Sequence, residues 1–361
     1  MRLFLIFSLL FITACAPPVS QITQLPDAAA PDDIPVFFAT SRAPDLVLRY
    51  GADRSEITGY GRYNISVPPA HESGQIEWPR RTPDALKHFV ATGENLYDGS
   101  QEFRRELASE LRKRPRGNRR ATIYVHGFLN SFADGIYRMA QLSHDFENPD
   151  IAVHYSWPSA AHPLGYLHDR DSMLFARRGL EELIHDVKAA GAQEILLVGH
   201  SMGGLLSMEV IRTMALRDSD QMLRMIDGVV LISADIDVDV FRNQLHDIGE
   251  LPDPLVLITS DRDPALRLSA WVTGLKQRVG TLGGAEDVSD FDILVINTGD
   301  YTTRGGHFNV GNSADLIETM QRMQGVVASL SDETQNRAGV GAGAVLVVQN
   351  AAQILLPPVA Q

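Results

Sequence analysis

The sequence feature that most constrains the fold is the segment EILLVGHSMGGLL, residues 194–206. The apolar run Ile195–Val198 predicts a short buried strand, and the apolar residues that end the segment predict the start of a helix. Gly199 and Gly203 flank Ser201, as expected for a turn too tight for neighbouring side chains. Such a turn places the serine hydroxyl clear of the sheet, beside free helix N–H groups that favour a developing negative charge. The pattern predicts a serine nucleophile; the alternative is a glycine-rich turn with an inert serine.

The chain after residue 120 repeats this alternation of strands and helices, which indicates a mostly parallel α/β sheet. The stretch 172–189 carries apolar residues at i, i+3, i+4 and i+7 from Leu180, the pattern of an amphipathic helix. We predict three further helices: one that begins at about residue 131, one that follows Ser201 and ends at about residue 216, and one at 312–330. We predict strands at residues 121–125, 151–156, 195–198, 228–233, 254–259 and 291–297.

Three strand-like runs come before this alternating part, at residues 35–40, 59–68 and 88–91. No predicted crossover helix separates them, so we expect them to pair antiparallel at the N-terminal edge of the sheet. A helix is predicted at 102–113, between these runs and the parallel part.

The N-terminus has the pattern of an export signal. Arg2 is followed by the apolar run Leu3–Ile12, which has the length of a signal-peptide core and is too short to span a bilayer. The segment Ile12-Thr13-Ala14-Cys15 at its end contains the only cysteine of the chain and resembles the lipobox of bacterial lipoproteins. We expect residues 1–14 to be a signal peptide and Cys15 to be lipidated. A plain secretory signal and a buried first strand are the alternatives.

The resemblance to a lipoprotein signal implies a place in the cell envelope. Ala16, rather than Asp, follows the cysteine, which in such lipoproteins implies the outer membrane, facing the periplasm. Residues 15–33 are rich in Pro and Ala and are expected to form a tether to a domain at 34–330. The tail 331–361 contains an uncharged stretch rich in Ala, Gly and Val, which we expect to be a loosely ordered tail or a surface helix rather than a membrane span.

Composition and motifs exclude several classes of function. The net charge of −13 over 361 residues argues against a nucleic-acid partner, because binding phosphates needs a basic surface. We find no phosphate-binding loop, no dinucleotide-binding fingerprint and no spacing of metal ligands. We therefore predict neither a cofactor nor a metal.

A serine nucleophile needs a base, and in sheets of this kind the order along the chain is serine, acid, histidine. Only two of the eleven histidines, His246 and His307, follow Ser201. His307 lies in a glycine-containing loop after the last predicted strand, whereas His246 lies in a predicted helical stretch. We therefore predict His307 as the general base, with His246 as the weaker candidate.

The acid that orients the histidine should follow one of the strands after Ser201. Asp261 and Asp263 both lie in the turn after the strand 254–259, and Asp235 and Asp237 follow the strand before it. Asp263 precedes a proline, so it could also be a helix N-cap. We favour Asp263, and the other three aspartates remain open.

An oxyanion hole needs two converging backbone N–H groups. Met202, after the serine, should supply one, and Phe128 should supply the other from the loop after the strand 121–125, where Gly127 permits close approach. We expect His126 and His200 to be structural residues. Motif position also puts a set of apolar side chains beside the site, as pocket walls or as packing: Phe128, Leu129, Trp157, Met202 and Phe308.

Five short motifs together resemble bacterial α/β-hydrolases grouped as uncharacterised esterase/lipase-superfamily proteins. They are HGF at His126, YSWPS at Tyr155–Ser159, GHSMGG at Gly199–Gly204, SDRDPALRLS at Ser260–Ser269 and GGHF at Gly305–Phe308. The resemblance covers roughly residues 35–330 and aligns the family's aspartate with Asp263.

The resemblance implies an α/β-hydrolase fold, with a mostly parallel central sheet, helices on both faces and antiparallel strands at the N-terminal edge. It also implies a serine hydrolase that cleaves carboxylic esters, from small-molecule or lipid substrates, through an acyl-enzyme. An amidase, a thioesterase or an acyltransferase would use the same triad. A protein of a different class, an envelope lipoprotein that uses the fold only for binding, is the remaining alternative.

Overall fold

A mixed sheet of eleven strands runs through the computed structural model of the chain, in the order β11-β10-β9-β8-β7-β6-β4-β5-β1-β2-β3. The structure describes residues 21–26, 33–272, 274, 277–284, 286–299, 307–321, 345–349 and 353–355. The strands are β1 (Asp33–Asp45), β2 (Arg49–Ser66), β3 (Val90–Tyr97), β4 (Arg120–Val125), β5 (Ile151–Ser156), β6 (Glu194–His200), β7 (Gly228–Ile232), β8 (Leu255–Thr259), β9 (Leu294–Asn297), β10 (Val345–Gln349) and β11 (Gln353–Leu355).

The helices connect these strands. They are α1 (Ser100–Arg112), α2 (Phe132–Asp145), α3 (Tyr166–Phe175), α4 (Arg177–Ala189), α5 (Met202–Arg217), α6 (Ser219–Met225), α7 (Val238–Ile248), α8 (Pro264–Val272) and α9 (Asn309–Asn312), with 3-10 turns η1 (Pro163–Gly165), η2 (Val279–Thr281) and η3 (Glu286–Val288). Residues 314–321 are also helical. None of the helices in the described part of the chain has the length and apolarity needed to cross a membrane.

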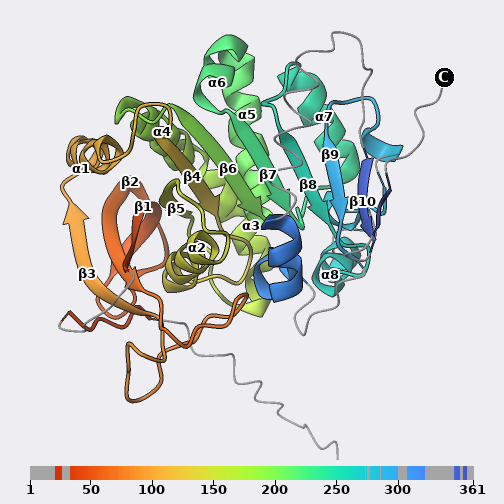
Figure 1. Cartoon of the computed structure of the whole chain (residues 1–361). Helices are drawn as coiled ribbons and strands as arrows, with labels where there is room; N and C mark the ends of the chain where they lie inside the picture. The colour runs from red at the N-terminus through yellow and green to blue at the C-terminus, as the bar shows by residue number, and fades with distance from the viewer. Residues whose placement is uncertain are drawn as a thin grey trace, which may run out of the picture.

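The parallel part of the sheet is built from β5, β4, β6, β7, β8 and β9, each in parallel register with its neighbour. β1 pairs antiparallel with β2 and parallel with β5, and β2 pairs antiparallel with β3. The antiparallel strands therefore form the N-terminal edge, with β3 at one side of the sheet and β10 towards the other (Figure 1). This confirms the predicted fold class.

Helices cover both faces of the sheet because neighbouring strand residues point to opposite sides. On β4, Ile123 packs into a core that includes α1, α4, α5 and α7, whereas the adjacent Tyr124 packs into a second core with α2. Leu231 and Ile232 divide between the two cores in the same way. The strands read as continuous apolar runs because both faces are buried.

The long helix predicted at 172–189 is two helices. α3 ends and α4 begins at Ala176, whose ψ of −6° departs from the helical value. The Tyr155 hydroxyl donates to the Ala176 carbonyl oxygen over 2.7 Å, a contact from β5 that amphipathic spacing could not reveal. The periodicity continues across the break, so the sequence alone shows one helix.

Both ends of the chain differ from expectation where the structure describes them. Thr23 and Leu25, within the segment predicted as a tether, exchange backbone hydrogen bonds with Ala91 of β3. In the predicted tail, residues 345–349 form β10, which pairs parallel with β9. Its Val-rich stretch suits a strand, and pairing with β9 supplies the backbone partners that an isolated tail lacks. The predicted signal peptide and Cys15 lie outside the described residues.

Candidate active site

Ser201 occupies the turn between β6 and α5 with a left-handed backbone, φ 53° and ψ −120°. This conformation is unfavourable for a residue with a side chain and persists because the surroundings hold it. The Ser201 N–H donates to the carbonyl oxygen of Ile232 on the neighbouring β7 over 3.0 Å, and its carbonyl accepts from the Asp235 N–H over 3.2 Å. The strand β7 and the loop that follows it therefore hold the serine in the strained turn.

The two flanking glycines are required by close packing of the backbone. A Cβ on Gly203 would overlap the carbonyl oxygens of Val125 and His126 at the end of β4. A Cβ on Gly199 would lie 2.7 Å from the Cα of Gly204, on the other side of the turn. The turn is therefore as tight as the glycines predict, and the obstructing atoms belong to the start of α5 and to the adjacent strand.

Asp263 and His307 are in direct contact. The Asp263 Oδ2 lies 2.7 Å from His307 Nδ1, and the carboxylate is fully buried. Its Oδ1 accepts from the N–H groups of Ala265 and Leu266, at 2.9 and 3.1 Å, at the start of α8. One carboxylate thus caps a helix with one oxygen and contacts the histidine with the other.

The other candidate acids and the other histidine lie elsewhere. Asp261 is exposed, and its carbonyl oxygen accepts from Arg267. Asp235 forms a buried ion pair with Arg278 over 3.3 Å, and Asp237 caps α7. His246 is exposed on α7, with its ring against Phe291. Of these residues, only Asp263 contacts His307.

Residues from three connections lie beside the Ser201 turn: the loop after β4, His200 at the end of β6, and His307 and Phe308 after β9. A Cβ on Gly127 would lie 2.8 Å from the Ser201 Cβ and 2.7 Å from His200 Nδ1, so the β4 loop lies against the serine turn. The His200 ring centroid is 4.9 Å from that of His307 and 4.4 Å from that of Phe308. His200 is buried, which lowers its pKa well below the ordinary value, so it is a neutral spacer between the loops.

The predicted oxyanion donors lie at the start of α5 and in the loop beside Ser201. Met202 is the first residue of α5, so its N–H has no acceptor within the helix. Phe128 follows Gly127 in the loop that lies against Ser201. The structure thereby brings the loops of Ser201, Phe128 and His307 to one edge of the sheet, the carboxyl ends of its parallel strands, where ligands bind in open α/β folds.

The predicted apolar walls divide into packing and surface residues. Trp157 is fully buried, stacked 4.9 Å from the His126 ring, and Met202 is buried in the core around α5. Phe308 is buried too, beneath the Arg138 guanidinium. Only Phe128 and Leu129 reach the surface. Motif position alone placed all five beside the site, but three of them are packing residues.

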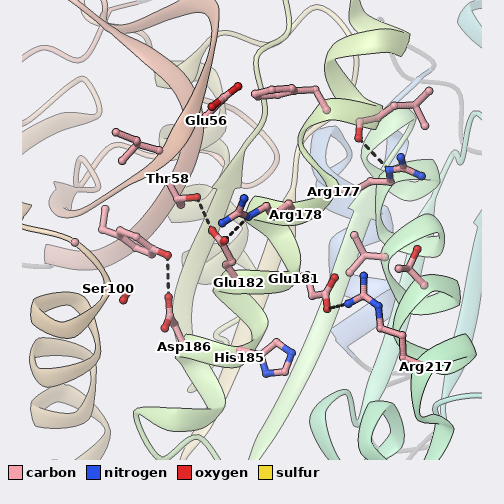
Figure 2. A pocket seen from close by; sticks show the side chains of 17 residues that line it. Glu56, Thr58, Ser100, Arg177, Arg178, Glu181, Glu182, His185, Asp186 and Arg217 are labelled. Carbon is pink, nitrogen blue, oxygen red and sulfur yellow. Dashed lines mark hydrogen bonds and ion pairs between the residues drawn. The ribbon is translucent and has the colours of Figure 1, made fainter.

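A cavity of about 1100 Å³ lies elsewhere, between β2, α1, α4 and α5 (Figure 2). Two ion pairs join charged side chains of its lining, Arg178 with Glu182 and Arg217 with Glu181. Tyr60 donates to Asp186 across its floor over 2.8 Å. None of its lining residues belongs to the three loops around Ser201. The candidate active site is therefore not this cavity, despite its size, because Ser201, Asp263 and His307 lie outside it.

One group among the described residues has the composition of a metal site, His71, His144 and Asp145. His71 Nε2 lies 2.7 Å from Asp145 Oδ1, and its Nδ1 lies 2.8 Å from Glu77. Burial would lower the pKa of His71, but the hydrogen bonds to the two carboxylates outweigh it and raise the pKa above the ordinary value. Both ring nitrogens therefore serve an ion-paired clamp between the loop 67–89 and the end of α2.

Sequence reasoning missed two cationic residues that hold the site loops. Arg138 of α2 donates to the Gly311 carbonyl over 2.9 Å and lies 4.9 Å over the Phe308 ring, next to His307. Arg42, at the end of an apolar stretch of β1, is buried, with its guanidinium among the loops after β4 and β5. The available signal in the sequence was an arginine two residues after the predicted strand 35–40.

Comparisons with known proteins give a family and distant structural likeness. No curated protein matches the chain. A solved structure of an Agrobacterium vitis S4 protein is 12% identical, with 76% of this chain and 95% of that chain covered at a TM-score of 0.34. An esterase from Pyrococcus furiosus is 10% identical, covering 89% and 99% at 0.30, and a lipase-esterase related protein from Clostridium acetobutylicum ATCC 824 is 15% identical, covering 60% and 93% at 0.23.

The family match covers the central part of the fold. The model for "Alpha/beta hydrolase of unknown function (DUF900)" matches residues 100–291, from α1 to the residues before β9. This range includes the serine turn and the aspartate that contacts His307 and amounts to more than half of the 361 residues. The chain therefore belongs to the DUF900 family of α/β hydrolases.

Proposed function

We propose that this hydrolase cleaves carboxylic esters through an acyl-enzyme formed on Ser201. The observation that carries the proposal is the 2.7 Å contact between His307 Nδ1 and the buried Asp263 Oδ2. A histidine held in this way keeps its other nitrogen for proton transfer, and it belongs to loops that meet at a serine in a strained turn.

The chemistry follows from these groups. His307 Nε2 takes the Ser201 hydroxyl proton as the oxygen attacks the ester carbonyl, and Asp263 accepts the Nδ1–H and stabilises the imidazolium. The N–H groups of Phe128 and Met202 bind the oxyanion of the tetrahedral intermediate. His307 then gives its proton to the leaving alkoxide. Water, deprotonated by His307, attacks the acyl-enzyme and releases the acid and the free serine.

The surface beside the site supports an apolar substituent on the substrate. Phe128 is half-buried and Leu129 is exposed in the loop that would supply an oxyanion donor. Tyr166 of α3 packs edge-on against Phe128, with ring centroids 5.5 Å apart. An ester with an apolar acyl or alkyl group would contact these rings.

A labelling experiment tests the nucleophile. A fluorophosphonate probe should label the wild type and a Ser289→Ala control, in which an exposed serine far along the chain is removed, but not Ser201→Ala. Ester hydrolysis across a series of acyl chain lengths should be lost in Ser201→Ala alone. Equal labelling of Ser201→Ala would refute the proposal.

Formation of a new ester in the presence of competing alcohols would identify an acyltransferase. Cleavage of amides or thioesters in preference to esters would show that the enzyme is an amidase or a thioesterase.

We further propose that Cys15 is lipidated and anchors the enzyme in the bacterial envelope, at the outer membrane facing the periplasm. The support is the apolar run Leu3–Ile12, which is followed closely by the only cysteine of the chain. Lipid chains on one cysteine would hold the protein at a membrane without any spanning helix. In cells, Cys15→Ala should move the protein from the membrane fraction to the soluble fraction. An unchanged membrane fraction would contradict this proposal.

A further inference from the structure

The peptide unit between Gly127 and Phe128 carries both the Gly127 carbonyl and the N–H proposed as an oxyanion donor. Because the peptide is planar and trans, its carbonyl and its N–H point in opposite directions. A group that holds the carbonyl therefore aims the N–H. The Gly127 oxygen lies 2.9 Å from His126 Nδ1, and Asn130 Nδ2 donates to it over 3.4 Å.

The ring nitrogen of His126 that carries the proton decides whether the ring attracts or repels the Gly127 carbonyl oxygen. Burial lowers the pKa of His126 well below its ordinary value, with the Arg42 charge adding to the effect, so the ring is neutral and carries one N–H. With the proton on Nδ1, the ring donates to Gly127. With the proton on Nε2, the ring would donate to the Trp157 carbonyl, 3.1 Å away, and turn a lone pair towards the Gly127 oxygen.

Arg42 selects between these two tautomers. Its Nη2 lies 3.5 Å from His126 Nε2, and a guanidinium only donates, so it favours a lone pair there. Ser156 Oγ, also 3.5 Å from Nε2, accepts from Arg42 Nε over 2.9 Å and can direct its own hydrogen to the histidine. Two donors thus face Nε2, against the one carbonyl of Trp157.

Arg42 is well placed for this role because it is anchored from several directions. The side chain is fully buried, which lowers the pKa of the guanidinium to about 10, still far above neutral pH. Its Nη1 donates to the carbonyls of Gly51 and Ser159, and its Nη2 donates to that of Asn130 over 2.8 Å. Asn130 in turn donates its amide to the Phe128 carbonyl over 2.8 Å, which fixes the next peptide of the same loop.

We propose that His126 and Arg42 are positioning residues: Arg42 keeps His126 in the Nδ1–H tautomer, and that N–H turns the Gly127–Phe128 peptide so that the Phe128 N–H can bind the oxyanion. The inference rests on the proposed function, since it assigns a role within the same reaction. Neither residue touches the substrate. The effect passes through a single peptide plane.

Replacing His126 by asparagine or by glutamine tests the roles of its two ring nitrogens separately. An asparagine amide reaches roughly the position of Nδ1, whereas a glutamine amide reaches roughly that of Nε2. Loss of one oxyanion donor costs about 10²-fold to 10³-fold in kcat. We therefore expect His126→Gln to lower kcat about 100-fold with KM nearly unchanged, and His126→Asn to lower it less than tenfold. Equal losses in both variants, or the reverse order, would overturn the proposal, with His185→Asn as a control for histidine replacement outside the site.

Direct observation of the tautomer provides a test that needs no activity. In the full chain labelled with ¹⁵N-histidine, the spectrum of His126, assigned by comparison with His126→Asn, should show Nδ1 protonated and Nε2 bare. Arg42→Met should shift the proton towards Nε2. A wild-type ring with its proton on Nε2 would refute the proposal even if Arg42→Met fails to fold. Full activity of Ser201→Ala would instead refute the proposed function and leave the tautomer measurement standing.

Discussion

The two oxygens of Asp263 act separately, one as a helix cap and one as the partner of His307, so a substitution can remove one role and keep the other. Oδ1 accepts two backbone N–H groups at the start of α8, and Oδ2 accepts from His307. In Asp263→Asn the amide oxygen can keep the cap, but the NH₂ group would then face His307 Nδ1, donor against donor. The ring must take the other tautomer, with its proton on Nε2, where the lone pair is needed to receive the serine proton.

The magnitudes for activity and stability therefore differ. In serine hydrolases with this triad, the wrong tautomer costs about 10⁴-fold in kcat. Asparagine caps a helix about as well as aspartate, so the melting temperature should stay nearly unchanged. Asp263→Ala loses the cap as well, which costs about 1 kcal/mol, or about 2–4 °C for a domain of this size.

The assay compares ester hydrolysis and thermal unfolding of Asp263→Asn, Asp263→Ala and Asp261→Asn, the last a control at the exposed aspartate of the same turn. We expect normal activity in Asp261→Asn, loss of activity in both Asp263 variants, and loss of stability in Asp263→Ala alone. Activity of Asp263→Asn within tenfold of the wild type would show that the His307 contact does not serve catalysis.

Two further predictions concern stability. A Cβ at Gly203 would overlap backbone carbonyls that cannot move aside, so Gly203→Ala should lower the free energy of unfolding by about 3 kcal/mol or more in a urea titration, whereas Gly283→Ala, with open space around it, should change little. Equal midpoints would contradict the packing argument. The raised pKa of His71 means that its clamp with Asp145 stabilises the fold fully below about pH 6.5 and is lost as pH rises through the raised value, whereas the depressed pKa of Asp145 removes it only in acid. His71→Gln should therefore cost more stability at pH 6 than at pH 9, and an equal cost at both would refute the assignment.

Much of the architecture follows from local sequence patterns. Apolar runs bounded by turns predict the parallel strands, and the predicted strand 151–156 coincides with β5. The spacing of glycines around Ser201 predicts its turn, because the turn depends only on the backbone conformation of a few neighbouring residues. The order of residues along the chain leaves His307 as the histidine of the last loop, and it lies there against Asp263.

Other features depend on contacts between segments far apart in the chain, where composition carries little information. The pairing of β1 with β5 and the pairing of β10 with β9 join residues separated by more than a hundred and by about fifty positions. The break at Ala176 coincides with a hydrogen bond from a tyrosine hydroxyl of another strand. An aromatic residue beside a motif can line a pocket or fill a core, and only the packing of Trp157 and Phe308 decides between them.

The sequence by itself therefore determined the fold class and the serine turn, and chain order predicted the histidine, because these depend on short-range geometry and on the order of residues. Tertiary structure decided which aspartate reaches that histidine, which apolar residues are buried, and how Arg42 and His126 hold the loop of Phe128. The physical reason is that hydrogen bonds and close packing act over a few ångströms in space, whatever the separation along the chain.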